Sequence, residues 1–225
     1  MTNEDLVEKV SGGKVQVLRA GEGSELPGGL FYAPSTITLV RDVGETYNIV
    51  DVGCFGEEEL VENLLKERNI SPTHIQRVLI THNHPDHIGT TGLFKVAEIY
   101  MPDSIFHLTD PNVFRLMGDD FMLEIGKEKK LTRDSDVSLI STPGHAGWDM
   151  SVLYRAKKNG KSIAMVGDLF WSQKDWEDGS EYINLCVNKE MQDKSREYVK
   201  NVLKPDVVVP GHGHAFSPVY EEVSI

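Results

Sequence analysis

The feature that most constrains this chain is a dense cluster of metal-binding side chains placed directly after an apolar segment. His82, His84, Asp86 and His87 follow Ile75–Thr81 in the pattern H-x-H-x-D-H. Imidazole nitrogens and carboxylate oxygens are ligands that zinc, iron and manganese accept in proteins. We interpret the segment as a strand that ends in a metal-binding loop. A polar loop in solvent is the alternative interpretation.

Three further metal-competent side chains each follow an apolar, strand-like segment. They are His145 after Val137–Ser141, Asp168 after Ser162–Val166, and His212 after Val207–Val209. Neighbouring glycines allow the backbone to turn sharply and to approach a ligand closely. Because the same construction occurs four times, the sequence predicts one metal site assembled from four strand ends rather than a solvated loop.

The rest of the chain mixes strand and helix patterns. Further strands are expected at Lys14–Leu18, Ser35–Arg41, Tyr47–Val52 and Met150–Tyr154, and helices at Glu57–Arg68 and Met191–Leu203. The first of these helices is amphipathic, with acidic residues early and basic residues late, as the helix dipole favours. Residues 1–11 are expected to be a short lead, and Gly21–Gly29 a surface loop. This pattern indicates two sheets with helices outside them.

Taken in order, the motifs H-x-H-x-D-H, P-G-H, G-D and P-G-H-G resemble those of the metallo-beta-lactamase superfamily. The resemblance extends from about residue 14 to residue 218. It implies an α+β fold, the αββα four-layer sandwich, in which two mixed sheets are flanked by helices and the metals lie at one edge. We expect residues 1–225 to form a single domain with its core at about 14–218.

The resemblance also implies a site for two divalent metal ions. Carried over by motif, it assigns the first metal to His82, His84 and His145, the second to Asp86, His87 and His212, and the bridging position to Asp168. Zinc is the expected metal, with iron and manganese as alternatives. Asp51 ends an apolar strand, and we expect it to hold a ligand histidine by a hydrogen bond. A turn-capping role is the alternative for Asp51.

The implied activity is that of a hydrolase in which a hydroxide shared by two metals attacks a carbonyl carbon or a phosphorus. Asp86 is expected to orient this hydroxide and to pass a proton to the leaving group. Candidate substrates are RNA phosphodiesters and small esters, thioesters or lactones. Stretches such as Ile49–Gly53 and Asp206–Gly213 resemble one subfamily for which RNA cleavage is implied.

Charge favours the small substrate over RNA. The formal net charge of −12 repels phosphates at long range, and we expect no stable binding to DNA. Lys127, Lys129, Lys130 and Arg133 form the one basic cluster that could meet RNA, although a solvated helix or turn is the simpler explanation of them.

Two other classes of function compete with the hydrolase. Relatives resembling persulfide dioxygenase use a single iron, held here by His82, His145 and Asp168, but the stretch Leu-Phe-Trp-Ser-Gln-Lys-Asp after Asp168 lacks their Arg-rich pattern. A non-catalytic binding module would have lost ligands, and all seven are present. Zinc β-lactamases of the common type have a cysteine at the bridging position, whereas this chain has Asp168, which argues against β-lactam hydrolysis. The chain ends at Ile225, 13 residues after His212, which argues against an added helical domain for glutathione.

Location and partners follow from what the sequence lacks. The acidic N-terminus resembles no signal peptide, and no apolar run is long enough to span a membrane, so a cytoplasmic protein is expected. Cys54 and Cys186 form no C-x-x-C motif, which suits a reducing compartment. The family resemblance is compatible with a homodimer. Contacts of His214, Trp148, Trp171 and Trp176 with substrate are left open.

Overall fold

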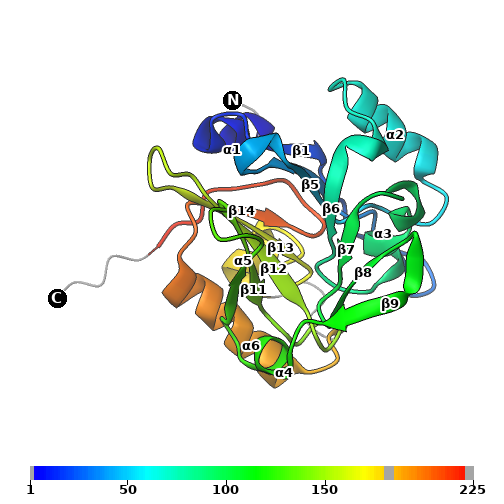
Figure 1. Ribbon diagram of the computed structural model, residues 1–225. Helices are drawn as coiled ribbons and strands as arrows, with labels where there is room; N and C mark the ends of the chain where they lie inside the picture. The colour runs from blue at the N-terminus through cyan, green and yellow to red at the C-terminus, as the bar shows by residue number, and fades with distance from the viewer. Residues whose placement is uncertain (1–2, 180–184, 221–225) are drawn as a thin grey trace.

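Two β-sheets lie face to face in the computed structural model, which describes residues 3–179 and 185–220 (Figure 1). The remaining parts of the predicted 1–225 domain, residues 1–2, 180–184 and 221–225, lie outside the described residues. The larger sheet has the order β1-β4-β5-β6-β7-β8-β9. Its strands are β1 (Val15–Arg19), β4 (Ile37–Arg41), β5 (Tyr47–Val50), β6 (Ile75–Leu79), β7 (Glu98–Tyr100), β8 (Ser104–His107) and β9 (Asp110–Leu116).

The second sheet has five strands in the order β10-β11-β12-β13-β14. They are β10 (Glu128–Lys130), β11 (Val137–Ser141), β12 (Met150–Arg155), β13 (Ser162–Gly167) and β14 (Val207–Pro210). Both sheets are mixed, because β5, β6 and β7 run parallel in the first and β13 and β14 run parallel in the second. A separate hairpin joins β2 (Ser24–Leu26) to β3 (Leu30–Tyr32).

Helices cover the outer faces of both sheets, which gives four layers. Helix α2 (Glu58–Lys66) buries Val61 and Leu65 on the outer face of the seven-stranded sheet. Helix α5 (Gln173–Asp178), helix α6 (Lys189–Tyr198) and the π-helical stretch Val199–Leu203 cover the five-stranded sheet. In Figure 1, α2 (cyan) and α6 (orange) lie on opposite sides of the sheets. The predicted αββα sandwich of the α+β class is confirmed.

The core between the sheets is built from the inward-facing residues of both, such as Val40, Val50, Leu139 and Val152. Short helices complete the fold: α3 (Pro85–Ile88), α4 (Asp119–Leu123), and the 3-10 turns Val43–Glu45, Pro72–His74 and Thr91–Leu93. In the described part of the chain, no helix combines the length and apolarity needed to cross a bilayer.

The expected lead at residues 1–11 is wrong, because Asn3–Ser11 forms helix α1. Its Val7 and Val10 are buried in the core between the sheets, and the helix packs on β1, β13 and β14. The expected loop at Gly21–Gly29 is correct only in part, since it contains β2. The other expected strands and helices agree with the structure to within about three residues, the normal uncertainty of element ends.

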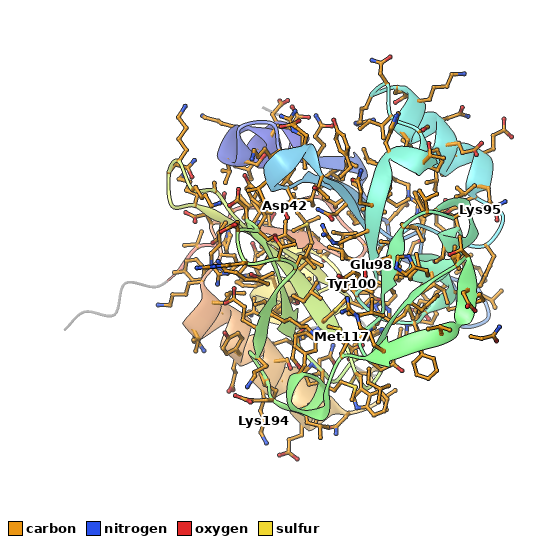
Figure 2. All side chains as sticks on the ribbon, in the orientation of Figure 1. Asp42, Lys95, Glu98, Tyr100, Met117 and Lys194 are labelled. Atoms are coloured by element: carbon orange, nitrogen blue, oxygen red, sulfur yellow. The ribbon has the colours of Figure 1, made fainter. Side chains whose placement is uncertain are left out.

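Opposite edges of the sandwich are joined in different ways. At one edge, where Figure 2 labels Asp42, Ser135 Oγ and the Asp136 amide donate to the buried Asp42 carboxylate (2.5 and 2.9 Å). At the other, the Met150 amide donates to Thr81 O (2.9 Å) and the Thr36 amide donates to Gly211 O (2.7 Å). This second edge is where β6, β11, β13 and β14 end, as the sequence predicts.

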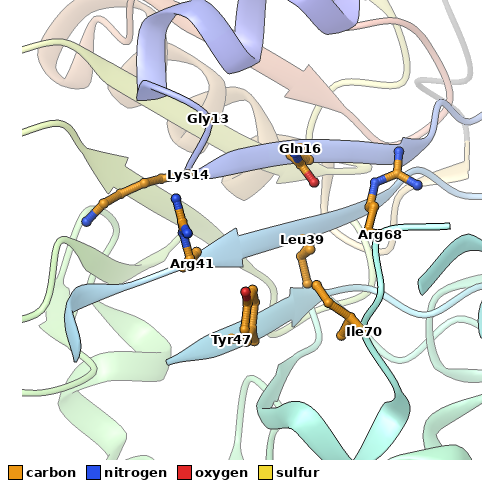
Figure 3. A pocket seen from close by; sticks show the side chains of 8 residues that line it. All are labelled: Gly13, Lys14, Gln16, Leu39, Arg41, Tyr47, Arg68 and Ile70. Atoms are coloured by element: carbon orange, nitrogen blue, oxygen red, sulfur yellow. The ribbon is translucent and has the colours of Figure 1, made fainter. Parts of the chain in front are cut away.

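A cavity of about 290 Å³ lies on the outer face of the seven-stranded sheet, lined by Lys14, Arg41, Tyr47 and Arg68 among others (Figure 3). Tyr47 begins β5, whereas Asp51 and the first predicted ligand loop follow the ends of β5 and β6. The cavity therefore lies away from the predicted metal site.

Candidate metal centre

The loop after β6 turns directly into α3, and this turn presents the first ligand set. His84 is the N-cap of α3 in an extended conformation, and Pro85 takes the first helical position, where its missing N–H costs nothing. His82 lies before the turn, and His87 lies on the helix itself. One short segment thereby directs side chains into the edge of the sandwich from both a loop and a helix.

All seven predicted ligands come together in two groups. The first consists of His82, His84, His145 and Asp168, and the second of Asp86, His87 and His212. Within each group the potential ligand atoms lie within 4.8 Å of one another. Asp168 lies between the groups, because its Oδ1 is 3.1 Å from His87 Nε2 and its Oδ2 is 3.4 Å from His145 Nε2.

Hydrogen bonds on the outside of the site orient three of the imidazoles. Nδ1 of His82 lies 3.0 Å from Thr81 Oγ1, Nδ1 of His87 lies 2.8 Å from Asp51 Oδ2, and Nδ1 of His212 lies 3.2 Å from Pro34 O. A proton held on Nδ1 by such a partner leaves Nε2 with a free lone pair, the form that binds a metal.

Buried polar atoms at this site fit a cation. Among the described residues, His82 Nε2, His87 Nε2 and Asp168 Oδ1 are buried and make no well-aligned hydrogen bond, although His87 Nε2 and Asp168 Oδ1 lie 3.1 Å apart. An unsatisfied buried polar atom is costly, and three of them facing one space indicate a missing partner. Nitrogen and carboxylate oxygen donors in two groups match divalent zinc, iron or manganese.

The electrostatics of the site favour positive charge. Burial alone would raise the pKa of Asp168, but His212 and His87 hold it well below its ordinary value, so the carboxylate is ionised. Burial lowers the pKa of His145 to about 4, against the attraction of Asp168, and this imidazole is neutral at neutral pH. Burial disfavours a charged His87, yet Asp168 and Asp51 raise its pKa well above 6.5. The ionised carboxylates of the site therefore stabilise positive charge next to them.

Asp51 lies directly beneath the ligand loop. Its carboxylate accepts hydrogen bonds from the Thr81 amide and Thr81 Oγ1 (both 2.8 Å) and contacts His87 Nδ1. Its φ of 52° lies in the left-handed region, which Asp tolerates better than most residues. The expected hydrogen bond to a ligand histidine is thus present, and it joins Asp51 to His87.

Exchanging Asp51 for asparagine is expected to weaken metal binding by about 10–100-fold, the usual effect of losing a partner of a ligand histidine. An amide nitrogen in place of Oδ2 would face Nδ1 of His87 and favour the tautomer with the proton on Nε2. Titration with a zinc-competing chelator measures the change. Asp42→Asn removes an equally buried, hydrogen-bonded carboxylate at the opposite edge. If it weakens zinc binding equally, the role given to Asp51 is wrong.

Helix α6 holds two ligand loops in place, and sequence reasoning missed this. Ser195 Oγ donates to Pro143 O (2.7 Å), Gln192 Nε2 donates to Asp168 O (3.4 Å), and Arg196 Nε donates to Leu169 O (2.8 Å). All three side chains are buried. The sequence shows only a helix rich in charged residues, and nothing in it identifies the backbone carbonyls that Ser195, Gln192 and Arg196 contact.

Asp149 is a further residue that sequence reasoning did not assign to the site. Its carboxylate accepts from the amides of Gly144 (2.8 Å) and Ala146 (2.9 Å), on either side of His145. Burial raises its pKa to about 6, although these amides favour the ionised form. Asp149 therefore fixes the loop that carries His145.

Glycine is required at position 211 for a steric reason. A Cβ at Gly211 would lie 2.1 Å from Asp168 Oδ1. We expect Gly211→Ala to displace this carboxylate, to lower the free energy of unfolding by about 1–3 kcal/mol, and to weaken metal binding. Gly92→Ala is the matched control, because nothing lies within 4 Å of a Cβ there. Thermal unfolding and metal content measure both effects, and equal behaviour of the two variants would contradict this account.

The histidine and the tryptophans whose contact with substrate the sequence leaves open lie in different surroundings. His214 is exposed and belongs to neither ligand group. Trp171 is buried with its ring 4.2 Å from that of His212, whereas Trp176 packs against Phe170 in the outer core. Trp148 is 51% exposed. Cys54 and Cys186, both in the described part of the chain, form no disulfide.

Comparison with known proteins agrees with this fold and site. The family model described as the metallo-beta-lactamase superfamily matches residues 32–212. The chain therefore belongs to the metallo-beta-lactamase superfamily. Its family and its cluster of histidine and aspartate ligands make it a metal-dependent hydrolase of that superfamily.

Several relatives share the name metallo-beta-lactamase domain-containing protein 1, the subfamily that Ile49–Gly53 and Asp206–Gly213 resemble. The Xenopus laevis protein is 30% identical over 203 residues, which cover 90% of this chain and 80% of the relative. The human protein is 30% identical over 175 residues, covering 77% of this chain and 60% of the relative, so less than two thirds of the human protein is matched. This resemblance is confirmed.

Among solved structures, a single-substitution mutant of AiiA from B. thuringiensis, with N-decanoyl-L-homoserine bound at its active site, has a TM-score of 0.63. The two sequences are 19% identical, and the match covers 89% of this chain and 93% of that one. At this level of identity the comparison supports the shared fold.

Proposed function

We propose that the protein hydrolyses carboxylic esters, thioesters or lactones with two divalent metal ions, zinc in the first instance. The observation that carries the proposal is the presence of two ligand groups with Asp168 between them. A single-iron oxidoreductase would need only His82, His145 and Asp168, and would leave the second ligand group without a function.

When bound, two such ions lower the pKa of a water molecule and polarise the substrate oxygen that gains charge. Asp168 and the imidazoles would hold the ions, while Asp51, Gln192 and Asp149 fix the segments that carry these ligands. Asp86 is the most accessible carboxylate of the site, with a side chain that is 19% exposed. It would orient the attacking water and hold its proton for the leaving group.

Local charge supports an ester over an RNA phosphodiester. In the expected basic cluster, Lys127 pairs with Glu124 (3.1 Å) and Lys129 donates to Met117 O (3.3 Å), so both ammonium groups already have partners. The B. thuringiensis neighbour holds an acylated homoserine at its active site. RNA is the alternative substrate, and the assay described next distinguishes RNA from the acyl substrates.

The test is an assay of zinc-loaded protein against p-nitrophenyl esters, a thioester, a lactone and labelled single-stranded RNA. We expect hydrolysis of at least one acyl substrate, its loss in chelator, and a reduction of about 10²–10⁴-fold in Asp86→Asn, the range for a lost acid–base group. Cleavage of RNA alone would assign the site to phosphodiesters. No hydrolysis by protein carrying its full metal content would contradict the proposal.

A further inference from the structure

A cavity of about 360 Å³, the Trp148 pocket, lies beside the first ligand group. Its lining includes Asn83, Ala146 and Trp148 from the ligand loops, and Met101, Asp103 and Phe106 from the β7–β8 segment. Its volume is within the range of small-molecule sites, which measure about 300–1,000 Å³.

The pocket is adjacent to the metal ligands along the chain. Asn83 stands between His82 and His84, and Ala146 directly follows His145. Since these three histidines belong to the first ligand group, the pocket borders that group rather than the second. A substituent on the reacting centre of a substrate would therefore meet the pocket within a few bonds of the site.

Trp148 is a rigidly supported, exposed aromatic ring. Trp148 is 51% exposed. The loop that carries it is held by the adjacent Asp149, whose carboxylate accepts hydrogen bonds from the amides of Gly144 and Ala146. A large apolar side chain held in solvent beside a polar site is typical of a binding contact, because little entropy is lost when a ligand covers it.

The opposite wall is also held by hydrogen bonds. The Met101 amide donates to Ser104 O, and the Met117 amide donates to Asp103 O (both 2.8 Å). Met101 and Phe106 are partly buried and pack against the outer core of the seven-stranded sheet. This wall gives the pocket an apolar surface on a firm base.

The charge of the lining selects against anions. Asp103 is the one ionisable residue among those that line the pocket, and no lysine or arginine is among them. A phosphate or carboxylate group placed there would face this carboxylate without a cation to balance it, whereas an uncharged hydrocarbon group meets Trp148, Phe106 and Met101.

We propose that the Trp148 pocket binds the uncharged, apolar acyl group of the substrate and so sets the preferred acyl length. This inference rests on the proposed function and names the part of the substrate that the site selects. Trp148 is the main contact, and Met101 and Phe106 form the opposing surface.

The first arm of the test compares p-nitrophenyl acetate, butyrate and octanoate with zinc-loaded protein. We expect kcat/KM to rise with acyl length, because each methylene in an apolar pocket contributes about tenfold or more. Trp148→Ala is expected to lower kcat/KM about tenfold on octanoate, in line with loss of an aromatic contact, with little change on acetate. Val202→Ala is the matched control, since it removes another exposed apolar side chain, 67% exposed and outside the pocket lining.

The second arm measures binding of octanamide and acetamide to metal-free protein by calorimetry, which needs no catalysis. We expect octanamide to bind more tightly than acetamide, and Trp148→Ala to weaken it about tenfold, in line with loss of an aromatic contact. Binding without any hydrolysis would overturn the proposed function and retain the pocket. Hydrolysis with the same octanoate-to-acetate ratio in both proteins, or no octanamide binding, would overturn the pocket and retain the hydrolase.

Discussion

Replacing Asp168 with asparagine is expected to lower ester hydrolysis by about a thousandfold, because the charge stabilisation that a metal pair supplies amounts to several kcal/mol. Asp168 Oδ1 lies 3.1 Å from His87 Nε2, and Oδ2 lies 3.2 Å from His212 Nε2 and 3.4 Å from His145 Nε2. No other described carboxylate contacts histidines of both ligand groups in this way. Asparagine keeps the shape but replaces one oxygen with a nitrogen that cannot bind a cation.

Initial rates at saturating zinc measure this effect. Asp136→Asn is the matched control, since its carboxylate is equally buried but pairs with Lys14 (3.8 Å) and Lys157 (2.9 Å), and lies with Asp42 at the opposite edge. The control is expected to keep its activity while losing some stability. An Asp168→Asn enzyme within tenfold of the wild type would remove Asp168 from the metal site.

The second large effect is on stability. Adding zinc to the metal-free protein is expected to raise the melting temperature by about 10 °C. A ligand present at about a thousand times its dissociation constant contributes about 4 kcal/mol, and each kcal/mol raises Tm by about 2–4 °C in a domain of this size. The physical reason is the set of buried atoms that make no well-aligned hydrogen bond, His82 Nε2, His87 Nε2 and Asp168 Oδ1.

Differential scanning calorimetry with and without a chelator measures this shift. Magnesium serves as the control ion, because imidazole ligands suit zinc and not magnesium. Asp168→Asn should show a much smaller shift with zinc than the wild type. An unchanged Tm on adding zinc to metal-free wild type would show that the buried atoms do not bind it.

The sequence predicts the ligands well because each belongs to a local motif. His145, Asp168 and His212 each follow a buried, largely apolar strand, and that pattern needs no knowledge of the partners. Only the fold brings these strand ends to the same edge. The resemblance to known motifs supplied that arrangement, and the structure places the seven side chains together.

The supporting residues could not be predicted in this way. Ser195 reaches Pro143 across 52 positions, and Arg196 reaches Leu169 across 27, so the partner of each is set by packing of α6 alone. The elements β9 and β10 were missed because they lie at sheet edges. Every residue of β9 is exposed, and β10 reads Glu-Lys-Lys, so neither shows the alternation that marks a half-buried strand.

The most direct test of the central claim is the number of metal ions bound to each chain. Zinc-loaded wild type, dialysed and analysed by inductively coupled plasma mass spectrometry, should hold two ions per chain, and Asp168→Asn should hold one or none. Restoring activity to metal-free protein should require both equivalents. Full activity at a single ion per chain, with the residues of the second group dispensable, would contradict the two-metal account.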